Sequence, residues 1–132
     1  LSPENIDQIN RLYVGAYTLK KEFNKVINYA RKLQTSESVH SMYIGKYSEV
    51  NAFKELGSPD SDQKYEETIK FFRNAMIKDP SDIAAVTFRI QCYMDIGNYI
   101  QAEQLCDLLS SEIRKPLLEK IQEAKAAGGD NK

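Results

Sequence analysis

The sequence predicts an all-α fold built from antiparallel helix hairpins. Apolar residues recur at spacings of three and four along most of the chain, as on one face of an α-helix. The six glycines and four prolines lie mostly between these periodic stretches, where they can end a helix. Strand-like alternation is not convincing anywhere, and 132 residues are enough for one domain of ordinary size. We therefore expect a single helical domain.

The expected helices start and stop at recognisable signals. Ser2-Pro3-Glu4 suits a helix start, because the serine can cap free N–H groups, proline fits the first turn and glutamate favours the positive end of the helix dipole. Gly57–Asp62 is the clearest loop, and we expect it to be exposed and mobile. Pro80 follows the end of one helix, Ser81 caps the next, and Gly97-Asn98 forms a tight turn. The expected helices cover residues 2–19, 23–33, 39–56, 65–77, 81–96, 99–110 and 116–127.

A six-residue motif recurs along the chain. Leu12-Tyr13-Val14-Gly15-Ala16-Tyr17 returns as Met42-Tyr43-Ile44-Gly45-Lys46-Tyr47 and, more weakly, as Phe88-Arg89-Ile90-Gln91-Cys92-Tyr93. The helices that follow share a second spacing, and its starts at Tyr65 and Tyr99 are 34 residues apart. With this period the chain resembles a tetratricopeptide repeat protein. The turn motif of that family is similar to Ile96-Gly97-Asn98-Tyr99-x-x-Ala102 in this sequence.

The resemblance implies a specific architecture. Three degenerate repeats cover about residues 5–38, 39–80 and 81–112, a capping helix covers 116–127, and residues 128–132 form a flexible tail. The first helices of the hairpins line the concave side of a right-handed superhelical stack, an α-solenoid, which forms one domain over residues 1–127. The family uses such a surface to bind proteins.

The resemblance also implies a peptide-binding groove across the three repeats. Its candidate residues come from the recurring motif and its flank: Arg11, Leu12, Gly15, Met42, Gly45, Phe88 and Gln91. The small residues would allow a partner backbone to approach closely, although these glycines could instead only permit close packing of neighbouring hairpins. The Lys and Asn clamp that some family members use for chaperone tails is largely missing, because the corresponding places hold Arg11, Gly15, Met42, Ala84 and Phe88.

Two other functions remain open at the sequence level. The repeats could act through self-association, and the apolar residues Leu117, Leu118 and Ile121 of the last helix would then be exposed rather than packed as a cap. Alternatively, the chain could recruit substrate for an enzyme domain elsewhere in a longer protein, because Leu1-Ser2-Pro3 contains no start methionine. We rank the protein-binding scaffold first.

No catalytic, metal or cofactor site is expected. His40 is the only histidine, no phosphate-binding or nucleophile motif is found, and Asp60-Ser61-Asp62 departs from a calcium loop at its later ligand positions. A formal charge of −1 argues against nucleic-acid partners, and no apolar run is long enough to span a membrane. Cys92 and Cys106 predict buried thiols and favour a cytoplasmic location.

Overall fold

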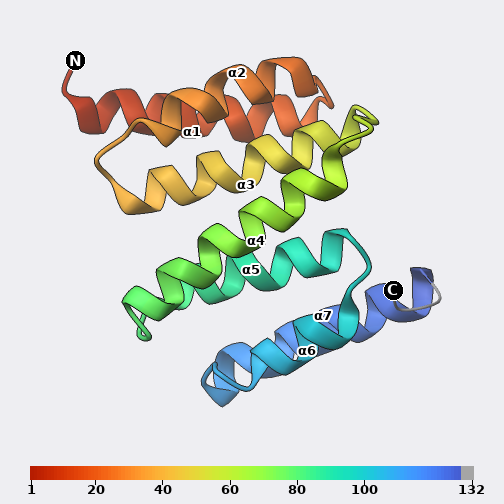
Figure 1. Cartoon of the computed structure of the whole chain (residues 1–132). Coiled ribbons are helices and arrows are strands. Elements are labelled where there is room, and N and C mark those ends of the chain that lie inside the picture. The colour runs from red at the N-terminus through yellow and green to blue at the C-terminus, as the bar shows by residue number, and fades with distance from the viewer. Residues whose placement is uncertain (129–132) are drawn as a thin grey trace. The chain divides into compact units, whose positions relative to one another are not determined.

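The computed structural model describes residues 1–128, and every regular element in that range is an α-helix (Figure 1). The predicted all-α class is therefore confirmed. Most of the expected tail, residues 129–132, lies outside the described residues. The helices are α1 (Pro3–Leu19), α2 (Phe23–Gln34), α3 (Val39–Glu55), α4 (Ser61–Lys78), α5 (Ile83–Asp95), α6 (Tyr99–Cys106) and α7 (Ser111–Gly128).

Two helices start earlier than the sequence predicts. The helix α4 begins at Ser61 rather than Tyr65, so the expected loop shrinks to the residues around Gly57–Asp60. Its first turn carries Asp62, whose carboxylate favours the positive end of the helix dipole. The helix α7 begins at Ser111, five residues before Pro116. Proline there removes only one backbone hydrogen bond, to the carbonyl four residues earlier, and so does not end the helix.

Capping at the start of α5 also differs from the prediction. Asp82, not Ser81, caps this helix, and its Oδ1 accepts a hydrogen bond from the N–H of Ala85 at 3.0 Å. The Ser81 hydroxyl donates instead to Asp79. At the other hairpin ends Ser2 and Ser38 cap α1 and α3 through their side chains, as their residue types favour.

The helices α1, α3 and α5 end in the same way. Each is followed by a residue with positive φ: Lys21 at 59°, Gly57 at 73° and Gly97 at 77°. In each case the N–H of that residue and the next N–H return to the carbonyls of the last turn, which is the Schellman arrangement. The helices α1, α3 and α5 therefore share one C-terminal structure, although Lys21 stands where glycine is preferred.

The first compact unit covers Leu1–Lys64. Within it α2 packs against both α1 and α3, and α1 also contacts α3. Its buried apolar cluster contains Val14, Val26, Ile27, Ala30, Leu33 and Ala52.

The second compact unit begins at Tyr65. Here α6 packs against α5 and α7, while α4 contacts α5 through stacked Phe72 and Phe88. The buried cluster contains Val86, Ile90, Met94, Ala102, Cys106, Leu109 and Ile121. Each unit thus has its own core, and the single domain, the repeat boundaries and the superhelical stack stay predictions.

Candidate binding surfaces

One face of α1 presents apolar side chains to solvent. Leu12 is 66% exposed, Leu19 is 86% exposed and Ile9 is 39% exposed, while Asn10 and Val14 on the opposite face are buried. Three- and four-residue steps place the exposed set on one stripe. Within the first unit, α1 therefore carries an apolar face that its own hairpin does not cover.

Arg11 connects this helix to α3. Its Nη1 donates a hydrogen bond of 2.5 Å to the Oγ of Ser41, which is fully buried next to half-buried Met42. Arg11 makes no ion pair within residues 1–128. Gly15 is exposed, and a Cβ atom added there would meet nothing within 4 Å. Arg11, Leu12, Gly15 and Met42 therefore belong to one pair of contacting helices.

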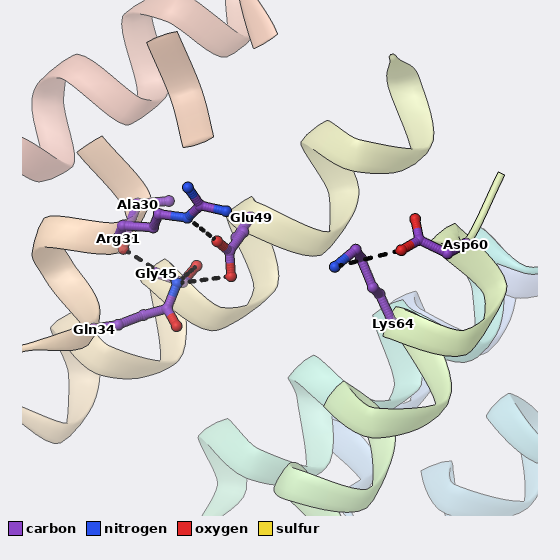
Figure 2. A network of polar contacts seen from close by, with 7 residues as sticks. All are labelled: Ala30, Arg31, Gln34, Gly45, Glu49, Asp60 and Lys64. Carbon is purple, nitrogen blue, oxygen red and sulfur yellow. Dashed lines mark hydrogen bonds and ion pairs between the residues drawn. The ribbon is translucent and has the colours of Figure 1, made fainter. Parts of the chain in front are cut away.

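Gly45 lies elsewhere, in the contact between α2 and α3. It is buried, and a Cβ atom there would lie 2.5 Å from the carbonyl oxygen of Ala30. Gln34 strengthens this contact by donating from Nε2 to the carbonyl of Gly45 at 3.2 Å and to Oε1 of Glu49 at 3.2 Å (Figure 2). The expectation that Gly45 admits a partner backbone is corrected: it permits close packing of neighbouring hairpins, the alternative raised for these glycines.

The shared helix ends explain this difference. Gly15 and Gln91 each precede the residue with positive φ by six positions, whereas Gly45 precedes Gly57 by twelve. The motif in α3 is therefore displaced by six residues, about 9 Å along the axis, which turns its glycine to another face. Counted from the residue with positive φ, Asn51 is the position of α3 that is equivalent to Gly15 and Gln91.

Phe88 and Gln91 are engaged inside the second unit. The Phe88 ring stacks on Phe72 with centroids 5.4 Å apart and planes inclined by 13°. Gln91 donates from Nε2 to Oδ1 of Asp95 at 2.8 Å, and the other oxygen of that carboxylate accepts from the Tyr65 hydroxyl at 2.8 Å. Both candidates are half-buried. Of the seven candidates, Arg11, Leu12 and Gly15 lie on α1, and Met42 lies on α3, which contacts α1.

Sequence reasoning missed a basic depression in the second unit. It has a volume of about 520 Å³ and is lined by α4, α5 and the start of α6. Three cationic side chains line it: Lys70 and Arg73 from α4 and Arg89 from α5. The spacing of Lys70 and Arg73 places both on one helix face, but only the packing of α4 on α5 brings Arg89 beside them.

The terminal helix α7 packs on the third hairpin. Ile121 is fully buried in the cluster with Ala102 and Cys106, and Leu117 and Leu118 are partly buried against it. These residues therefore act as a cap on this hairpin rather than as an exposed association surface. Ile121 is therefore buried without a second copy of the chain.

The remaining candidates for chemistry have structural surroundings. Cys92 and Cys106 form no disulfide and are buried, and burial raises the pKa of both thiols. Asp60 accepts a hydrogen bond from Ser58 and pairs with Lys64 at 3.8 Å, and these contacts lower the pKa of its carboxyl (Figure 2). His40 is exposed in the first turn of α3. Within residues 1–128, none of the helices combines the length and apolarity needed to cross a membrane.

A recurring C-terminal structure on α1, α3 and α5, with a terminal helix packed on α6, is typical of a helical-repeat protein. The family comparison agrees, because a family model described as a tetratricopeptide repeat matches residues 61–127. The chain belongs to the tetratricopeptide repeat family. Comparison with curated proteins and with solved structures gave no significant match. Repeats of this family generally act as protein–protein interaction modules and are typically non-catalytic.

Proposed function

We propose that this chain is a non-catalytic interaction module that binds a peptide or helix of a partner protein on the exposed face of α1. The observation that carries the proposal is the apolar stripe at Ile9, Leu12 and Leu19, which the first unit leaves uncovered. Exposed apolar patches of this kind are typical of interaction sites. Family membership supports the same general role.

The surroundings of the stripe favour a particular kind of ligand. Leu12 provides an apolar contact, and Gly15 one turn away leaves open space above the helix backbone. Arg11 has no carboxylate partner within residues 1–128 and can pair with an acidic side chain at the edge of the ligand. An amphipathic helix or an extended peptide with an acidic flank fits these features.

The proposed surface is narrower than the groove that the sequence alone suggests. It retains Arg11, Leu12, Gly15 and Met42 and excludes Gly45, which is buried against α2. Phe88 and Gln91 are also excluded. The Phe88 ring stacks on Phe72, and the Gln91 side chain donates a hydrogen bond to Asp95. In the two alternative functions the same surface would bind a different ligand. It would bind a second copy of the chain in self-association, or the substrate of an enzyme domain in substrate recruitment.

A capture experiment with matched variants tests the proposal. The wild-type chain, Leu12→Asp and the control Ile100→Asp are immobilised and exposed to source-cell lysate, because Leu12 and Ile100 are both exposed apolar residues, at 66% and 49%. We expect Leu12→Asp to lose captured proteins that Ile100→Asp retains. Equal capture by Leu12→Asp and wild type, with unchanged helical circular dichroism, would contradict the proposal.

A further inference from the structure

Two neighbouring depressions in the second unit form a groove with a polar half and an apolar half. The polar half, of about 520 Å³, includes Lys70, Asn98 and Gln101 in its lining. The apolar half has about 300 Å³ and is lined by Met76, Ile77, Pro80, Val86 and Leu108. Arg73 and Arg89 line both depressions and therefore lie where the halves meet. We call the two depressions together the Arg73–Arg89 groove.

The polar half carries an excess of positive charge. Three cationic side chains line it, and Glu66 is the only acidic residue in its lining. Within residues 1–128, neither Lys70 nor Arg73 forms an ion pair or a hydrogen bond through its side chain. Their charges are therefore free to attract an anionic group into the groove.

Arg89 is held in place without an anionic partner. Its guanidinium lies over the Tyr93 ring, 5.5 Å from the centroid, and its Nη2 donates to the Tyr93 hydroxyl at 3.3 Å. The contact of its Nη1 is with the Met76 sulfur at 3.8 Å, a weak acceptor. Its Nε is buried without any acceptor in the part of the chain that the structure describes. A buried donor without an acceptor lowers stability. An oxygen atom of a ligand at this place could accept the missing hydrogen bond from Nε of Arg89.

We propose that the Arg73–Arg89 groove binds an acidic peptide segment, with one carboxylate at the two arginines and an adjacent leucine-sized side chain in the apolar half. Guanidinium groups bind carboxylates through paired, charge-assisted hydrogen bonds. The apolar half offers Ile77 and Leu108, which are 72% and 62% exposed and would be covered by such a side chain. A simple inorganic anion would leave these two residues uncovered.

The structural alternative for Arg89 is that its stem only covers apolar surface while its head lies on Tyr93. That role accounts for Arg89 but not for Arg73, which is exposed and lines the same two depressions. A substitution at Arg73 therefore distinguishes a binding role of the groove from a packing role of Arg89. The inference rests on the proposed function only in taking the ligand to be a peptide, because the groove lies in a different unit from α1.

The test uses the Nε–Hε signals of the arginines in ¹H–¹⁵N spectra of the full chain. The probes are a set of blocked hexapeptides made of glycine and serine. Each peptide carries one Asp and one Leu, and the set covers every pair of positions for the two residues. For each peptide, one matched version has Asn in place of Asp and another has Gly in place of Leu. We expect at least one Asp–Leu peptide to shift the Arg89 Nε–Hε signal, with affinity at least about tenfold above that of its Asn version. Replacing Leu by Gly should weaken binding several-fold.

Three variants complete the design. Arg73→Ala and Arg89→Gln should each weaken binding about tenfold, whereas Lys120→Ala, which removes a positive charge from an exposed site on α7, should bind the probe as wild type does. If Arg89→Gln fails to fold, Arg73→Ala alone decides. Wild-type affinity in Arg73→Ala, equal affinity for the Asp and Asn peptides, or inorganic phosphate shifting Arg89 as strongly as the peptide would overturn the proposal. None of these readouts involves α1, so this inference and the proposed function fail independently.

Discussion

Two glycines from the same recurring motif have opposite surroundings. A Cβ atom at Gly15 would meet nothing within 4 Å, whereas at Gly45 it would lie 2.5 Å from the backbone oxygen of Ala30. Gly15→Ala should raise the free energy of unfolding by about 0.5–1 kcal/mol, since alanine is the better helix former. Gly45→Ala should lower it by about 1–3 kcal/mol, because α2 and α3 must move apart. Urea denaturation of the two variants measures both, and a stabilising Gly45→Ala would contradict the observed packing.

Lys21 occupies a position that its two counterparts fill with glycine. Its φ of 59° is unfavourable for a residue with a side chain, whereas Gly57 and Gly97 adopt such values readily. Lys21→Gly should therefore increase the free energy of unfolding by about 0.5–1 kcal/mol. The control is Lys20→Gly, where φ is −80° and glycine should be destabilising. If both variants lose stability equally, the cap at Lys21 is not the one described.

The buried cysteines predict a pH dependence. Burial raises the pKa of the Cys92 and Cys106 thiols, so both stay protonated in the folded chain at pH values where the unfolded thiols, with pKa about 8.5, ionise. The unfolded state then binds fewer protons than the folded state, and stability falls as the pH rises above about 8.5. Native chain at pH 8 should react slowly with a disulfide reagent and quickly in denaturant. Rapid labelling of both native thiols would contradict their burial.

At the scale of helices, local signals predict most of the boundaries. Ser2 and Ser38 cap their helices, and Gly57 and Gly97 end theirs, because these residue types suit those backbone conformations. The early start of α7 is harder to predict from sequence. Pro116 normally marks a boundary, yet one lost hydrogen bond near a helix start is outweighed by the packing of Ile121.

That packing makes α7 part of the core of the second unit. Ile121→Ala should lower the free energy of unfolding by about 2–5 kcal/mol, because a fully buried side chain would leave a cavity beside Ala102 and Cys106. The control Ile113→Ala, at a position 38% exposed, should cost less than about 1 kcal/mol. Chemical denaturation with circular dichroism measures both losses. An Ile121→Ala variant as stable as wild type would return α7 to the list of possible association surfaces.

Across the whole chain, sequence reasoning predicts the helical-repeat class better than it predicts the site. Apolar spacing identifies the faces that pack, and the recurring motif selects Leu12 as a groove residue on α1, where the structure has it exposed. It misplaces Gly45, because a motif match does not reveal a six-residue displacement relative to the helix end. Arg89 was missed because its surroundings depend on how α4 and α6 meet α5, which no local pattern records.

Site-specific photocrosslinking can detect partners that bind the exposed face of α1 in the cell. A benzoylphenylalanine is placed at Leu12 or, as an exposed apolar control, at Ile100 on α6, and the chain is irradiated in its source cells. We predict crosslinks from position 12 to one or a few other proteins, at several times the yield from position 100. Crosslinks from position 12 only to a second copy of the chain, or equal yields from the two positions, would show that other proteins do not bind this face of α1.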